Sequence, residues 1–195
     1  LYAQDSKTRE QMDEALVALI DRSCKDAFLG YVPDETKFDY VIMSPGVSPE
    51  LEFVKKAEQA GAEVIGELEL AYRLCKGIFV AITGTNGKTT TTSLVGEIFE
   101  RSKRKTSVVG NIGKAVIGAA LEATKDDWLV TEVSSFQLET TREFRPLVSA
   151  ILNLTPDHLN RHHTMEAYGA AKAKIFANQN KEQYLIINYD DNYNF

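Results

Sequence analysis

The chain has 195 residues, of which 44% are hydrophobic and 26% charged, and its net charge of -6 disfavours nucleic acid as a partner. No apolar run approaches the roughly 18 residues of a membrane helix, and no signal peptide is evident, so we expect a cytoplasmic protein without membrane insertion. Cys24 and Cys75 lie far apart and lack metal-ligand spacing, which favours free thiols over a disulfide or a metal site.

The first third of the sequence predicts a βα repeat. Apolar residues at helical spacing predict a helix at Thr8–Asp21, and Phe38–Met43 is an apolar run of strand length that ends at the turn residues Ser44-Pro45-Gly46. A helix is predicted at Pro49–Ala60, with proline near its first turn, and a short strand at Glu63–Ile65.

Strands and helices continue to alternate after Gly66, which predicts an α/β fold with a parallel sheet covered on both faces. A helical stretch at residues 66–76 leads to a domain boundary near Gly77. Beyond it, strands are predicted at 77–82, 106–109, 128–133, 147–154 and 184–188. Helices are predicted at 88–102, after the turn at 111–113 to about 123, at 135–143 and at 165–178.

The stretch Val80–Thr92 predicts a site for nucleotide phosphates between a strand and a helix. Its glycines let backbone N–H groups approach an anion, Lys88 adds a mobile positive charge, and Thr89 places a hydroxyl where Mg²⁺ would bind. The predicted ligand is a nucleoside triphosphate with Mg²⁺. The residues expected at the phosphates are Gly84, Thr85, Asn86, Gly87, Lys88, Thr89 and Thr90.

This phosphate-loop pattern is incomplete, because Ile82 stands where the full pattern has a glycine. What remains is Gly84-x-x-Gly87-Lys88-Thr89 after a predicted strand and before a predicted helix. That context favours a phosphate site over a Gly-Lys-Thr turn without function.

Polar residues follow several predicted strands at their carboxyl ends, where ligands bind in open parallel sheets. They are Ser44–Gly46, Thr83–Thr89, Asn111, Glu132–Ser135 and Asn153–His158. Glu132 ends an apolar strand, where a carboxylate is costly unless it is paired or bound to a metal, and it could reach Mg²⁺ held by Thr89. A surface carboxylate or one at a helix N-terminus is the equally weighted alternative.

His158 and Lys172 each leave two interpretations open. His158 follows a Pro-containing turn and could bind a metal or a substrate carboxylate, although a lone loop histidine is usually solvated. His162 and His163 lie nearby in a predicted polar loop with a spacing that fits no common zinc pattern. Lys172 lies among alanines, where a depressed pKa would let its neutral amine form a carbamate with CO₂, but an exposed or snorkelling lysine is commoner.

Five segments together resemble the Mur ligases of bacterial cell-wall synthesis. They are GTNGKTT (84–90), GNIG (110–113), EVSSFQLET (132–140), ILNLTPDHLNRH (151–162) and YGAAKAKIF (168–176). SPGVSP (44–49) and the GELEL stretch extend the resemblance toward the N-terminus. SSFQLE favours the member that adds D-glutamate to UDP-N-acetylmuramoyl-L-alanine, since sister ligases and folylpolyglutamate synthases share the phosphate loop but differ there.

The resemblance implies a partial Rossmann-like UDP-binding domain at residues 1–76 and a partial phosphate-loop ATPase domain with a parallel-rich sheet at residues 77–195. It implies that the C-terminal amino-acid-binding domain is absent, so we expect this piece alone to be inactive. In such enzymes ATP phosphorylates the L-alanyl carboxylate, and the amine of D-glutamate attacks the acyl phosphate. We expect a monomer.

The resemblance also implies residue roles. Lys88, His158 and Lys172 would be catalytic, and two Mg²⁺ sites would be formed by Thr89, Glu132, His158 and Lys172, the last as a carbamate. The residues implied to contact the UDP-linked substrate are Ser44, Pro45, Gly46, Asn111 and His158.

Two other interpretations stay open beside this one. The chain could belong to a different phosphate-loop enzyme, such as a sister ligase, a folylpolyglutamate-type ligase or a kinase, or it could be a truncated nucleotide-binding module without catalysis. Asn160 departs from the family pattern, in which relatives often have Asp, and this leaves the chemistry of its loop uncertain.

Overall fold

The structure, a computed structural model, describes residues 1–33 and 37–191. Its contacts define two compact units. Unit 1 contains residues 1–41 and 49–63, and unit 2 contains residues 42–48 and the chain from Val64 onward.

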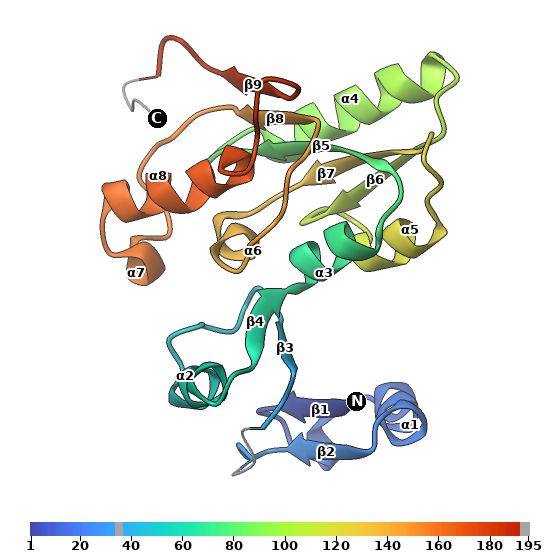
Figure 1. Ribbon diagram of the computed structural model, residues 1–195, viewed down its shortest axis with the longest axis vertical. Helices are drawn as coiled ribbons and strands as arrows, with labels where there is room; N and C mark the ends of the chain where they lie inside the picture. The colour runs from blue at the N-terminus through green and yellow to red at the C-terminus, as the bar shows by residue number, and fades with distance from the viewer. Residues whose placement is uncertain (34–36, 192–195) are drawn as a thin grey trace. The chain divides into compact units, whose positions relative to one another are not determined.

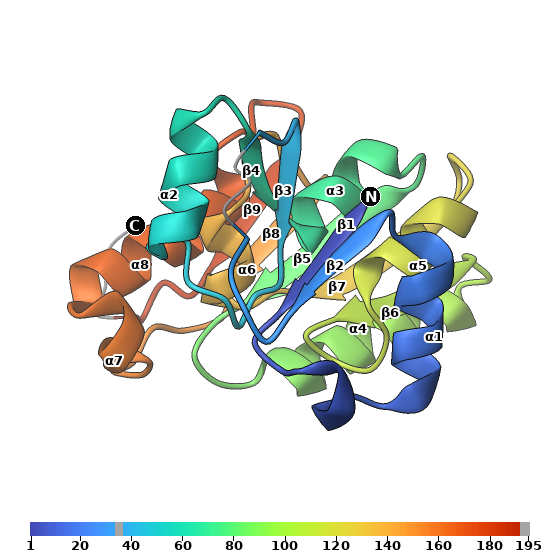
Figure 2. The same cartoon turned by 90° about the horizontal axis from the view of Figure 1, so that it is seen from below.

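Unit 1 contains a parallel pair of strands, β1 (Tyr2–Asp5) and β2 (Asp26–Leu29), with helix α1 (Glu14–Ser23) beside them (Figure 2). The sequence analysis did not predict either strand, because both are short and largely solvent-accessible and therefore lack a clear apolar pattern. Helix α2 (Glu52–Gln59) confirms the predicted second helix. Strands β3 (Tyr40–Met43) and β4 (Glu63–Gly66) form a separate two-stranded sheet.

The predicted first helix begins six residues later than expected. Asp13 is its N-cap, and its carboxylate accepts hydrogen bonds from the backbone N–H groups of Ala15 and Leu16. Thr8 instead caps a separate single turn, η1 (Arg9–Gln11).

Unit 2 is built on a five-stranded, fully parallel sheet in the order β6-β7-β5-β8-β9, which confirms the predicted α/β class. Its strands are β5 (Ile78–Thr83), β6 (Thr106–Gly110), β7 (Trp128–Glu132), β8 (Val148–Ile151) and β9 (Tyr184–Ile187). The strand that precedes the phosphate loop, β5, is therefore central, between β7 and β8.

Two layers of apolar side chains cover this sheet. Phe79 and Ala81 of β5 face a core shared with α3 (Glu67–Leu74), α5 (Val116–Glu122) and α6 (Ser135–Glu139), whereas Val80 and Ile82 face α4 (Lys88–Arg101). Figure 1 shows α4 on one side of the sheet and α3, α5 and α6 on the other. The alternation follows from the two-residue period of a strand.

Helix α6 ends four residues earlier than predicted. Its last carbonyl, on Glu139, accepts a hydrogen bond from Lys174 Nζ, and three backbone N–H groups of residues 142–144 donate to the buried carboxylate of Glu69. Hydrogen bonds to Glu69 of α3 and to Lys174 therefore replace the helical hydrogen bonds that would have extended α6. The remaining elements are α7 (Leu159–His162), which the sequence did not predict, α8 (Met165–Ala173) and η2 (Lys174–Phe176).

Helix α3 lies before the predicted domain boundary near Gly77, but it packs within unit 2. Leu68 and Ala71 belong to the same core as Phe79, and Glu67 accepts a hydrogen bond from the N–H of Ile117 in the first turn of α5. The division of the chain at residues 76 and 77 stays a prediction.

Candidate functional site

The loop between β5 and α4 has the backbone conformation that its glycines were expected to allow. Gly84 and Gly87 have φ angles of 151° and 81°, which side chains with a Cβ rarely adopt. A Cβ on Gly84 would also lie 3.1 Å from Cβ of Leu152. Gly87 is the N-cap of α4, so the loop leads directly into the positive end of a helix of 14 residues.

The loop is fixed against the segment that follows β8. Asn86 N–H donates to Asn153 Oδ1 at 2.8 Å, and Asn153 Nδ2 donates to Asn86 O at 3.0 Å. The hydroxyl of Thr85 donates to Thr155 O at 3.1 Å and accepts from Thr155 N–H at 3.0 Å. Two strand ends that are about 70 residues apart in sequence therefore form one rigid edge.

Lys88 folds back over the loop. Its Nζ donates to the carbonyl oxygens of Gly84 at 3.0 Å and Thr85 at 2.9 Å. These contacts hold a positive charge at the N-terminus of α4, where phosphate oxygens would replace the two carbonyls as stronger partners.

Glu132 contacts two other predicted site residues directly, Thr89 and Asn111. It is 2% exposed, Thr89 Oγ1 donates to its Oε2 at 2.8 Å, and Asn111 Nδ2 donates to its Oε1 at 3.0 Å. Both of these partners are neutral, so neither places a positive charge beside the buried carboxyl group. A carboxylate and a hydroxyl beside a phosphate loop are the oxygen ligands that Mg²⁺ prefers, and the donor set therefore fits this metal.

Lys172 is buried under the phosphate loop. Its side chain is 1% exposed, and Nζ donates to Gly84 O at 2.9 Å and lies 4.6 Å from the ring centroid of Tyr168. Burial, and then the positive charge of Lys88, lower the pKa of this amine to about 7, while Asp157 opposes the shift. The structure excludes the exposed or snorkelling alternative for Lys172.

Aromatic rings connect Lys172 with the segment after β8. The ring of Tyr168 lies 6.2 Å from that of His158 and 5.2 Å from that of His162, and the ring of Phe136 lies 4.9 Å from that of His158. His158 is exposed and stands at the N-cap position of α7 with a φ of 52°. Tyr168 escaped the sequence analysis, although its position four residues before Lys172 on one helix was a usable signal.

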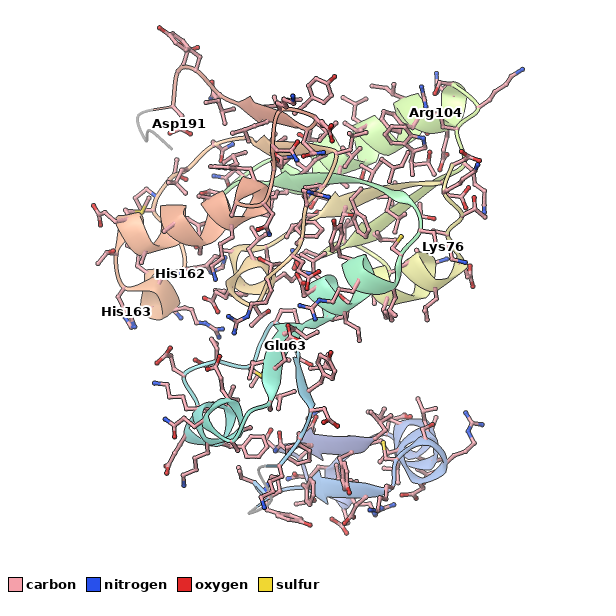
Figure 3. All side chains as sticks on the ribbon, in the orientation of Figure 1. Glu63, Lys76, Arg104, His162, His163 and Asp191 are labelled. Carbon is pink, nitrogen blue, oxygen red and sulfur yellow. The ribbon has the colours of Figure 1, made fainter. Side chains whose placement is uncertain are left out.

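His162 lies in helix α7 and is 7% exposed, so its predicted place in a polar loop is wrong. Its Nε2 lies 2.9 Å from Ser135 Oγ, and its Nδ1 lies 3.5 Å from Glu139 Oε1. Burial lowers the pKa of the imidazole, and the charge of Glu139 partly opposes this effect. Figure 3 shows His162 and His163 at this end of unit 2.

The predicted residues do not all meet. Within residues 1–33 and 37–191, no group of three or more His, Cys, Asp or Glu side chains could hold a metal by itself. The ring of His158 contacts Phe136 and Tyr168, which are not among the predicted site residues. Ser44-Pro45-Gly46 lies in a turn closed by Val47 N–H to Ser44 O at 3.0 Å, and Arg161 connects this turn to α7 through Val47 O.

The comparison with protein families decides the identity of this fold. The model of the "Mur ligase middle domain" matches residues 82–195. The chain belongs to the Mur ligase family. The resemblance found in the sequence is thereby confirmed, and the phosphate loop, Glu132 and Lys172 all lie within the part that matches the Mur ligase model.

Relatives with assigned names support the same placement. The chain is 56% identical to a "UDP-N-acetylmuramoylalanine--D-glutamate ligase" of Alkaliphilus oremlandii, over 98% of this chain and 43% of that protein. It is 53% identical to a protein of the same name from Clostridioides difficile, over 96% of this chain and 41% of that protein. The chain thus spans about two fifths of the length of the curated relatives that it matches.

Solved structures of Mur ligases share the fold. The "UDP-N-acetylmuramate:L-alanyl-gamma-D-glutamyl-meso-diaminopimelate ligase" of Neisseria meningitides superposes with a TM-score of 0.59 at 15% identity, over 98% of this chain and 64% of that chain. MurF from Acinetobacter baumannii gives a TM-score of 0.51 at 18% identity, over 84% of this chain and 46% of that chain. In the part of this chain that the structure describes, every helix is too short or too polar to cross a membrane.

Proposed function

We propose that the intact protein joins the amine of D-glutamate to the L-alanyl carboxyl group of UDP-N-acetylmuramoyl-L-alanine, at the expense of ATP. The observation that carries this proposal is the phosphate loop held between the buried carboxylate of Glu132 and the buried amine of Lys172. The names of relatives that are 53% to 56% identical supply the two substrates.

The reaction needs two steps that balance without a further reactant. A carboxylate oxygen of the substrate attacks the γ-phosphorus of ATP, so that an acyl phosphate forms and ADP leaves. The neutral amine of D-glutamate then attacks the acyl carbon, which forms the amide, expels phosphate and releases a proton. Two anions must meet in the first step, and positive charge at this strand edge lowers their repulsion.

Each candidate residue has a role in this scheme. Lys88 exchanges its loop carbonyls for the phosphates of ATP, and the N–H groups of residues 84–90 surround the same oxygens. Asn111 and the turn Ser44-Pro45-Gly46 position the UDP-linked substrate. His158 contacts the reacting carboxylate end, and Lys172 acts there through the second metal.

We propose two Mg²⁺ ions, one held by Thr89 and Glu132 and one held by His158 and Lys172. When bound, they screen the negative charges of the phosphates and of the substrate carboxylate. A charged amine at Lys172 would repel the second ion, so we propose that this residue acts as a carbamate, which presents oxygens instead.

The test measures phosphate release by the intact protein with each substrate omitted in turn. Release should require ATP, UDP-N-acetylmuramoyl-L-alanine and D-glutamate together. Equal release without an amino acid, or with L-alanine in place of D-glutamate, contradicts the proposal. Phosphate transfer to an acceptor without its release indicates a kinase, and ATP binding without turnover indicates the non-catalytic module.

A further inference from the structure

Arg161 contacts two other segments of unit 2, the turn that ends at Val47 and helix α6. From α7, its Nη2 donates to Val47 O at 3.2 Å and pairs with Glu139 Oε2 at 2.5 Å, and its guanidinium lies 5.0 Å from the ring centroid of Phe136. The Arg161 and Glu139 side chains are only 19% and 17% exposed. This ion pair is therefore shielded from solvent, unlike an ordinary surface pair.

The partners of Arg161 adjoin two parts of the proposed site, the turn at residues 44–47 and the ring of His158. Val47 closes the turn that contains Ser44-Pro45-Gly46, where the UDP part of the substrate is proposed to bind. The ring of Phe136 lies 4.9 Å from that of His158, at the reacting end of the proposed substrate.

Glu139 contacts both Arg161 and His162, the two residues that pack against Phe136. Both of its oxygens accept from Arg161, Oε2 from Nη2 and Oε1 from Nε at 3.4 Å, and Oε1 also lies 3.5 Å from Nδ1 of His162. Nε2 of His162 lies 2.9 Å from Ser135 Oγ. The ring of His162 stacks on Phe136 at 5.5 Å and 23°. Phe136 is thus held by Arg161 and by His162, and both are fixed by the one carboxylate of Glu139.

We propose that Arg161 is a positioning residue that couples the turn at residues 44–47 to the ring of His158, so that binding of the UDP part orients the reacting carboxylate end. This inference rests on the proposed function. It requires the forked guanidinium, because one side chain has to bond a carbonyl, pair with a carboxylate and lie against an aromatic ring at once. A lysine in its place keeps the charge but offers no planar fork.

The test compares Arg161→Met and Arg161→Lys with Arg101→Met in the intact protein. Arg101 is a matched control, since it also pairs with a glutamate, Glu97, but on an exposed helix surface where its side chain is 80% exposed. The measurements are Kd of the UDP-linked substrate, KM for ATP, kcat and Tm. The double variant Arg161→Met with Glu139→Gln removes the carboxylate charge that the single variant would leave behind.

For Arg161→Met we expect a rise in Kd of the UDP-linked substrate and a fall in kcat of about tenfold each, the usual range for residues that orient a ligand-binding group. KM for ATP should stay within about twofold, because the phosphate loop is untouched. On a logarithmic scale, Arg161→Lys should retain less than half of the binding and kcat that Arg161→Met loses. Adding Glu139→Gln to Arg161→Met should not restore binding of the UDP-linked substrate. Arg101→Met should change neither Kd nor kcat.

A lower Tm with unchanged Kd and kcat overturns the inference, since it would show a structural role alone. Equal effects on ATP and on the UDP-linked substrate overturn it as well. If the proposed function is wrong, the unmodified protein releases phosphate at the same rate with and without D-glutamate. An unmodified protein that does not bind the UDP-linked substrate refutes both.

Discussion

Lys172 offers the sharpest test of the site, because its chemistry depends on a measurable shift. Its pKa is lowered from 10.5 to about 7 by burial and by the charge of Lys88. At neutral pH about half of the amine is then neutral, compared with about one part in three thousand for an unperturbed lysine. Only the neutral amine can attack CO₂, so carbamate formation gains about three orders of magnitude.

The perturbation is Lys172→Ala, with Lys76→Ala as control. Lys76 lies on the exposed connection between α3 and β5 (Figure 3). Isotopically labelled bicarbonate should give a carbamate signal by NMR in the unmodified protein and in Lys76→Ala, but not in Lys172→Ala. Phosphate release by Lys172→Ala should fall at least about a hundredfold, and acetate should restore part of it by placing a carboxylate in the vacated space. Full activity of Lys172→Ala without acetate refutes the carbamate role.

The same shift predicts how stability depends on pH without CO₂. Between about pH 7 and pH 10.5 the unfolded chain binds a proton at Lys172 that the folded protein does not, so stability rises with pH through this window. The contribution approaches about 5 kcal/mol as an upper limit. The free energy of unfolding, measured in urea at several pH values, should rise less steeply with pH in Lys172→Ala than in the unmodified protein. A constant loss of stability from the cavity does not alter this pH dependence. An equal pH dependence in the two proteins contradicts the burial argument.

Three further substitutions test other parts of the site and its support. Lys88→Met should lower kcat at least about a hundredfold with little change in Tm, because its charge acts on the phosphates; a Tm loss without a kcat loss contradicts this. Glu69→Gln should cost about 3–5 kcal/mol in urea unfolding, since the buried carboxylate pairs with Arg73 and accepts three backbone N–H groups; a cost below about 1 kcal/mol refutes that role. Gly66→Ala should cost about 1–3 kcal/mol because its Cβ would lie 2.3 Å from Thr140 Oγ1, and adding Thr140→Ala should recover most of it; no recovery would place the strain elsewhere.

Local sequence determined the central part of this protein. The apolar strand β5, the two glycines with positive φ and the helix that begins at Lys88 follow from residues next to one another in the chain. Alternation of strands and helices was sufficient for the parallel sheet, because crossover connections of this length favour parallel pairing. The short strands β1 and β2 were not predicted, since four partly exposed residues are too few for a recognisable alternation of apolar and polar side chains.

Only the tertiary structure decided which side chains are buried together. Lys172 meets the carbonyl of Gly84 across 88 residues of sequence, and Thr89 meets Glu132 across 43. Burial of the lysine, and hence its shifted pKa, depends on packing between α8 and the phosphate loop that no local pattern contains. Propensity and periodicity act over a few residues, whereas desolvation and hydrogen bonding depend on whichever distant segments the fold brings into contact.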